Sequence, residues 1–93
     1  MSSTCDIERA VIIVNKYGLH ARPAAEFVKL AAGFTAIIMV RKDDLEVNGK
    51  SIMGMMMLAA ERGSEIVIRA TGEDASDAVN ALVGLVTRRF DEE

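Results

Sequence analysis

The segment from Ser64 to Thr71 alternates between apolar and polar side chains, which is the pattern of a strand with one buried face. One face carries Ile66, Ile68 and Ala70, and the other carries Glu65, Val67, Arg69 and Thr71. Sheets that are buried on both faces need near-continuous apolar strands instead. The alternation therefore predicts an antiparallel sheet whose helices all lie on one side.

The rest of the chain divides into elements of both kinds. Further strands are predicted at Glu8–Asn15, Ala36–Lys42 and Leu45–Val47, the last two joined by a turn at Asp43-Asp44. Helices are predicted at Ala21–Ala32, at Ile52–Ala60 after the N-cap Ser51, and at Glu73–Arg89. The last helix has an apolar stripe made of Ala75, Ala78, Val79, Leu82, Leu85 and Val86. The predicted order is β-α-β-β-α-β-α, a small α+β domain.

Length and composition limit the functions open to the chain. Its 93 residues predict one domain over residues 8–93, after a flexible polar leader at residues 1–7. A net charge of −3 argues against general nucleic-acid binding, and no apolar run is long enough for membrane insertion. Cys5 stands alone, so no internal disulfide is expected, and no metal-ligand spacing is present. These features predict a cytoplasmic protein.

His20 is the single histidine of the chain, and it lies between Gly18 and Pro23. Proline is favoured in the first turn of a helix, so His20 is expected at or just before a helix N-terminus. Unpaired backbone N–H groups and the helix dipole favour an anion there, and Arg22 adds a cation suited to phosphate. The pattern is typical of an imidazole that takes up a phosphoryl group. Taken alone, however, such a histidine is more often a capping or surface residue.

The helix that follows Ser51 is apolar nearly all round, with the sequence Ile-Met-Gly-Met-Met-Met-Leu over residues 52–58. A helix that docks on a sheet needs about half of its circumference apolar. Some of these side chains are thus expected to face outward, as in a surface that adapts to several partners. The alternative is that every methionine fills the core. Ser51 is open to two interpretations as well, a structural N-cap or a phosphorylation site.

The two motifs together resemble those of the HPr family, the histidine-containing phosphocarriers of the bacterial phosphotransferase system. Residues 18–24, Gly-Leu-His-Ala-Arg-Pro-Ala, look like the active-site signature, and residues 50–54, Lys-Ser-Ile-Met-Gly, look like the regulatory-serine signature. The resemblance extends from Glu8 onward and covers both the sugar-transport and the nitrogen branches of the system. It implies an open-faced β-sandwich with a four-stranded antiparallel sheet covered on one face by three helices.

The resemblance also implies roles for individual residues. His20 would be the phospho-acceptor through Nδ1, Arg22 the phosphate-contacting arginine, and Ser51 the target of a serine kinase. The residues that would dock partners are Ala21, Ala25, Lys29, Ile52, Met53 and Met56. The protein would be a phosphoprotein and a carrier, not an enzyme, and would need no metal or cofactor.

The implied partners are proteins of the same system. A monomeric carrier would receive its phosphoryl group from Enzyme I and pass it to Enzyme II A domains. A serine kinase/phosphorylase and a transcription regulator are possible further partners. The alternative function is a regulatory adaptor that acts mainly by protein–protein binding, in the nitrogen branch or in its phosphoserine state.

Overall fold

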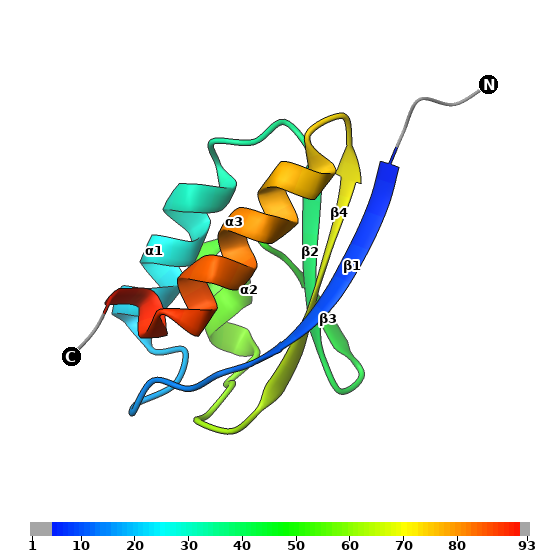
Figure 1. The fold of residues 1–93 in the computed structure, drawn as a ribbon. Helices are drawn as coiled ribbons and strands as arrows, with labels where there is room; N and C mark the ends of the chain where they lie inside the picture. Colours follow the sequence, from blue (N-terminus) through cyan, green and yellow to red (C-terminus); the bar gives the residue numbers. More distant parts are fainter. Residues whose placement is uncertain (1–4, 92–93) are drawn as a thin grey trace.

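The computed structural model describes residues 5–91, which form a four-stranded sheet covered by three helices (Figure 1). The strands are β1 (Cys5–Ile12), β2 (Ile37–Lys42), β3 (Leu45–Asn48) and β4 (Glu65–Gly72). The helices are α1 (Ala21–Ala31), α2 (Ile52–Met57) and α3 (Ala75–Thr87), followed by a 3-10 turn, η1 (Arg89–Asp91). The order of the three helices and four strands is the predicted one.

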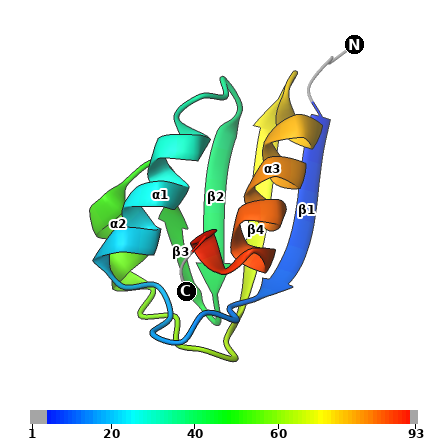
Figure 2. The ribbon, with the colours of Figure 1, turned by 60° about the vertical axis from the view of Figure 1, so that its left-hand side comes forward.

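The sheet has the strand order β1-β4-β2-β3, and every neighbouring pair is antiparallel. All three helices lie on one side of it (Figure 2). Helix α3 packs against β1 and β4, while α1 lies beside α2, which contacts β3. The α+β open-faced sandwich with a four-stranded antiparallel sheet is therefore confirmed.

The core lies between the sheet and the helices. The alternation that predicted the sheet holds in β4, where Ile66, Ile68 and Ala70 are fully buried. The predicted stripe of α3 is confirmed as well, and all of its members are buried: Ala75, Ala78, Val79, Leu82, Leu85 and Val86. Phe27 on α1 is the largest fully buried side chain. Burial of this periodic apolar surface is the main force that holds the layers together.

Three elements have bounds that differ by two or more residues from those predicted, and the others agree to within one residue. Strand β1 runs from Cys5 to Ile12, three residues earlier than expected at both ends. Residues 5–7 of the predicted leader thus pair with β4, and residues 1–4 lie outside the described residues. The strand ends early because β4 begins at Glu65, the partner of Ile12, and the chain then turns towards α1.

The other two elements are helices that end earlier than predicted, and α3 also begins at Ala75 and not at Glu73. Helix α2 ends at Met57 and not at Ala60, because Ala59 adopts a positive φ of 50° and turns the chain. Helix α3 ends at Thr87 and not at Arg89. Arg89 and Phe90 have positive φ values of 60° and 56°, and the side chain of Phe90 is buried. A tertiary contact overrides helix propensity in this last turn.

Candidate functional site

His20 is the N-cap residue of α1, with extended backbone angles. Its carbonyl oxygen accepts the first helical hydrogen bond, from the N–H of Ala24 at 3.0 Å. Its imidazole is exposed and does not cap the helix. The helix itself supplies no acceptor for the N–H groups of Ala21 and Arg22, and Pro23 has no N–H to offer. An exposed imidazole therefore lies at a helix end that favours an anion.

The loop before His20 is held by backbone contacts to the segment after α2. Gly18 has a positive φ of 68°, and a Cβ atom there would lie 2.4 Å from the carbonyl oxygen of Ala60. The N–H of the next residue, Leu19, donates to that same oxygen at 2.8 Å. Only glycine fits such a close approach with this backbone. The position of His20 is thus fixed by contacts distant in sequence.

Asn15 supports the same loop from inside. Its side chain is fully buried, and Nδ2 donates a hydrogen bond of 2.7 Å to the carbonyl oxygen of Gly18. The N–H of Gly18 in turn donates to the carbonyl oxygen of Asn15 at 3.2 Å. This role was not predicted, although an asparagine three residues before a glycine is a common turn pattern.

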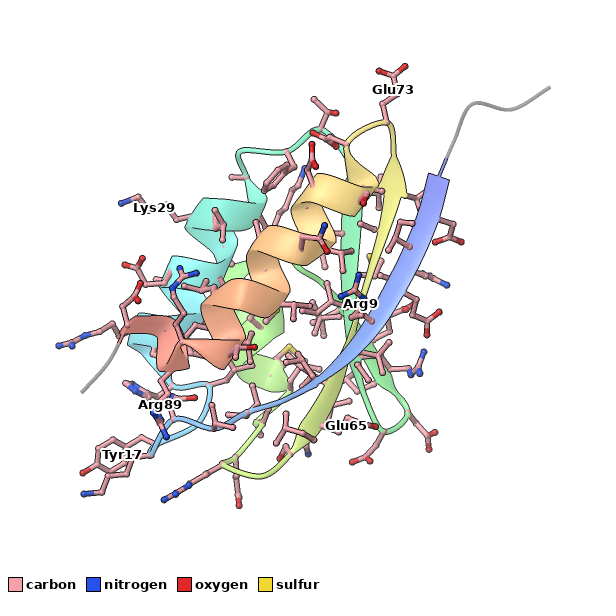
Figure 3. All side chains as sticks on the ribbon, viewed as in Figure 1. Arg9, Tyr17, Lys29, Glu65, Glu73 and Arg89 are labelled. Atoms are coloured by element: carbon pink, nitrogen blue, oxygen red, sulfur yellow. The ribbon has the colours of Figure 1, made fainter. Side chains whose placement is uncertain are left out.

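Tyr17 lies beside the candidate phospho-acceptor and was also missed as a site residue. Its side chain is 71% exposed and projects from the body of the molecule (Figure 3). The centroids of the Tyr17 and His20 rings are 6.1 Å apart, and the ring planes are nearly perpendicular, at 86°. The ammonium nitrogen of Lys16 lies 5.3 Å from the centroid of the Tyr17 ring. No signal in the sequence reveals these contacts, because they depend on the turn at Gly18.

The exposed side of α1 carries the remaining candidates on that helix. Arg22, Glu26 and Lys29 are all exposed, as their spacing predicts, and Lys29 points into solvent (Figure 3). Ala21 is exposed and Ala25 is half-buried. Arg22 lies in the first turn of the helix, so its guanidinium adds positive charge near the helix end at which His20 is placed.

Helix α2 exposes most of its apolar side chains. The exposed fractions are 46% for Ile52, 75% for Met53, 45% for Met56 and 63% for Met57, whereas Met55 is fully buried. We call these four exposed side chains the α2 patch. The outward-facing interpretation of this helix is therefore confirmed, with Met55 as the residue that fills the core. Helices α1 and α2 contact each other, so the patch lies on the helix next to the one that begins at His20.

Ser51 is the N-cap of α2, as predicted. Its hydroxyl oxygen accepts a hydrogen bond of 3.0 Å from the N–H of Gly54, and its side chain is half-buried. The preceding Lys50 is turned towards another loop, because its Nζ donates to the carbonyl oxygen of Phe34 at 2.7 Å. The structure thus accounts for Ser51 as a cap, and phosphorylation at Ser51 stays a prediction.

The carboxyl group of Asp74 has a lowered pKa. Asp74 is the N-cap residue of α3 and does not belong to the site around His20. Its carboxylate accepts hydrogen bonds of 2.8 Å from the backbone N–H groups of Thr35 and Ala36. The bond from Thr35 is the main cause that lowers the pKa of Asp74 below its ordinary value. These bonds join the loop after α1 to the start of α3, so the shift reflects structure rather than the chemistry of His20.

The part of the chain from Cys5 to Asp91 lacks two features that are typical of other functional classes. It holds no group of three or more His, Cys, Asp or Glu side chains arranged to bind a metal ion. Among the same residues, no helix has the length and apolar character needed to cross a bilayer.

Comparisons with known proteins agree on one family. Residues 7–88 match the family model described as the PTS HPr component phosphorylation site. A phosphocarrier protein HPr from Pseudomonas putida is 49% identical over 85 residues, which cover 90% of this chain and 94% of that protein. The HPr of Neisseria meningitidis serogroup B is 43% identical over 86 residues, covering 92% of this chain and 97% of the relative.

Solved structures give the same result. A crystal structure of HPr from Thermoanaerobacter tengcongensis superposes with a TM-score of 0.90 at 47% identity, and the match covers 94% of this chain and 98% of that one. The relatives also include an HPr-like protein Crh from Halalkalibacterium halodurans, 44% identical over 88% of this chain. On the family model, the identities and the shared fold, this chain belongs to the HPr family of phosphocarrier proteins of the bacterial phosphotransferase system.

Proposed function

We propose that this protein carries a phosphoryl group on His20, from Enzyme I to an Enzyme II A domain, in the cytoplasm. The observation that carries the proposal is the exposed imidazole at the N-terminus of α1, on a loop fixed through Gly18, Leu19 and Ala60. A rigid, solvent-facing acceptor can meet two different partners in turn. The anion-favouring helix end gives the transferred group a place to reside.

The chemistry requires no group beyond this chain and its partners. A neutral imidazole uses the Nδ1 lone pair to attack the phosphorus of the donor phosphohistidine, in line with the leaving nitrogen. A new P–N bond forms as the P–N bond of the donor breaks. The ring of His20 then releases the proton on Nε2, and the departing donor ring takes up a proton, so the donor imidazole and phosphorylated His20 both end with neutral rings and no net proton is consumed. The helix N-terminus and Arg22 stabilise the phosphate in its new position.

Stabilisation of the phosphate must stay moderate, because a carrier has to release its load. Two features favour this balance. Pro23 removes one N–H from the first turn of α1, and Arg22 is exposed, where solvent weakens its attraction to a phosphate. A carrier must accept the phosphoryl group from one partner and give it up to another, so moderate binding of the phosphate suits it better than tight binding.

Incubation with Enzyme I and radiolabelled phosphoenolpyruvate tests the proposal. The protein should take up one phosphate in an acid-labile, base-stable linkage, and His20→Ala should take up none while it keeps its melting temperature. Label on His20→Ala at the wild-type level would refute the assignment. A wild-type protein that stays unlabelled by an active Enzyme I would refute the relay itself.

Arg22→Ala tests the role of the arginine in the same assay. It removes a charge-assisted contact of about 1.5–3 kcal/mol, so transfer should slow by roughly one to two orders of magnitude. Arg41→Ala is the matched control, because Arg41 lies in β2 on the sheet face away from the helices and should leave the rate unchanged. Equal rates for the two variants would mean that Arg22 only lines the polar side of α1.

A regulatory adaptor is the second candidate function, and the α2 patch favours it. Four exposed apolar side chains directly after Ser51 form a surface suited to protein binding. A phosphate on Ser51, added by a serine kinase, would alter this surface without contacting His20. A transcription regulator is one partner that would bind the altered surface. Binding of the phosphoserine form in a His20→Ala background would separate the adaptor function from the relay.

A further inference from the structure

Tyr17 is a large aromatic residue whose side chain lies outside the core. Its side chain is 71% exposed, whereas the aromatic side chains of Phe27 and Phe90 are buried. It precedes Gly18, whose positive φ of 68° turns the chain between Tyr17 and His20. The turn brings the two rings to a centroid distance of 6.1 Å at 86°. The ring thus has a specific neighbour, although it packs little against the fold.

The geometry of this pair is one that aromatic rings favour. Perpendicular rings with centroids 4.5–7 Å apart place the positive edge of one ring against the negative face of the other. The Lys16 ammonium, 5.3 Å from the Tyr17 ring, is within the range of a cation–π contact. Tyr17 is therefore bounded by a cation and by the imidazole, and both contacts restrict the ring.

We propose that Tyr17 is a positioning residue for His20: its ring restricts rotation of the imidazole and holds the orientation that accepts the phosphoryl group. The inference rests on the proposed relay function. Only some rotamers of an exposed imidazole present the attacking nitrogen to an in-line donor. A neighbouring ring that favours one orientation raises the fraction of productive encounters.

The positioning role predicts a particular kinetic signature. Loss of the ring should lower the rate of transfer once the carrier is saturated with phosphorylated Enzyme I. The concentration of Enzyme I that gives half the maximal rate should change little, because the docking residues are untouched. Loss of the interaction between two aromatic rings corresponds to roughly a two- to tenfold decrease in the rate of phosphoryl transfer.

Tyr17→Leu and Tyr17→Phe form the test pair, since leucine keeps apolar bulk while phenylalanine keeps the ring. In the free protein, the imidazole ring protons of His20 are followed by NMR. Tyr17→Leu should remove the ring-current shift of these protons, and Tyr17→Phe should preserve it. Ile37→Ala is the control, because Ile37 is 65% exposed on β2 and should not affect the imidazole. Both Tyr17 variants should melt within a degree or two of the wild-type protein.

Single-turnover transfer from phosphorylated Enzyme I then measures the effect on function. Tyr17→Leu should be about two- to tenfold slower at saturation, and Tyr17→Phe should be close to the wild-type rate. Unchanged imidazole signals in Tyr17→Leu would overturn the proposal. A full saturating rate with a weaker apparent affinity would also overturn it, and would make Tyr17 a partner contact instead. A wild-type protein that takes no phosphate would refute the relay, and the NMR comparison would still report on the ring pair.

Discussion

The backbone N–H of Leu19 donates a hydrogen bond of 2.8 Å to the carbonyl oxygen of Ala60, joining the loop before α1 to the segment after α2. Both residues are buried, so the bond is shielded from water. Because His20 follows Leu19 directly, the position of the imidazole depends on where α2 ends. The motif at residues 18–24 is thus linked through the backbone to the segment that follows α2, the helix that carries the motif at residues 50–54.

Gly18→Ala should disrupt this link. The new Cβ would lie 2.4 Å from the carbonyl oxygen of Ala60, in a backbone conformation that alanine disfavours. We expect a loss of at least ~3 kcal/mol in the free energy of unfolding, together with slower phosphoryl transfer. Urea denaturation and the transfer assay measure the two effects.

Gly63→Ala is the matched control for Gly18→Ala. Gly63 also has a positive φ, 91°, but a Cβ there would meet no atom within 4 Å. The control should cost only about 1–2 kcal/mol, from backbone strain alone, and should keep the wild-type transfer rate. Equal losses in the two variants would show that strain, and not the contact with Ala60, sets the requirement for glycine at position 18.

Met53 and Met55 lie two residues apart on α2, and the same substitution should affect docking at Met53 but stability at Met55. Met53→Glu changes a side chain that is 75% exposed, so stability should stay within about 0.5 kcal/mol. Docking to Enzyme I should weaken roughly tenfold or more, because a charge enters a contact that must shed water. Thermal melts and the dependence of transfer on Enzyme I concentration are the measurements.

Met55→Glu completes the comparison. Met55 is fully buried, so the same substitution should cost about 4 kcal/mol or more in stability. Unimpaired docking by folded Met53→Glu would contradict the interface role of the patch.

Local sequence pattern predicted the parts of the structure that depend on neighbouring residues. The alternation in β4 and the stripe of α3 each place apolar groups on one face, and both faces are buried as expected. Ser51 is an N-cap for the same local reason. Pro23 marked the start of α1, with His20 at its N-cap.

Long-range contacts decided what the pattern missed. Helix α2 stops before Ala60, whose carbonyl oxygen accepts from Leu19, a residue 41 positions earlier. Burial of Phe90 ends α3 early in a similar way. Asn15 and Tyr17 acquire their roles through the turn at Gly18, and periodicity carries no information about such contacts.

Stability at low pH should depend on Asp74. Hydrogen bonds from the N–H groups of Thr35 and Ala36 lower its pKa in the folded state below the ordinary value of 3.8. A depressed folded-state pKa means that the charged carboxylate stabilises the fold above the unfolded pKa. This contribution is lost as the pH falls from about 3.8 through the lower folded pKa.

Asp74→Asn tests this linkage by urea denaturation from pH 7 down to pH 2. The wild-type protein should be more stable than the variant by a constant amount near neutral pH, and the difference should shrink below pH 4. Asp77→Asn is the control, because Asp77 is exposed in the first turn of the same helix. A stability difference for Asp74→Asn that does not change with pH would contradict the assignment.

Ser51→Asp tests whether the serine regulates transfer or only caps α2. An aspartate is a favourable N-cap, so the melting temperature should stay equal or rise slightly. The new charge borders Ile52 and Met53, which are exposed in the α2 patch, and their docking requires the loss of water. It would also repel an acidic partner surface that is matched to Arg22 and Lys29. Transfer from Enzyme I to His20 should therefore slow by orders of magnitude.

Ser51→Asn is the matched control for Ser51→Asp, since asparagine caps a helix as well as aspartate does but carries no charge. It should keep both the stability and most of the transfer rate. Slow transfer in the aspartate variant alone would assign the effect to charge at the border of the patch. A full rate in Ser51→Asp would mean that the hydroxyl, which accepts the Gly54 N–H at 3.0 Å, serves only the fold. In that case negative charge at Ser51 would not regulate the protein, and the adaptor function would lose its support. The proposed relay through His20 would be unaffected.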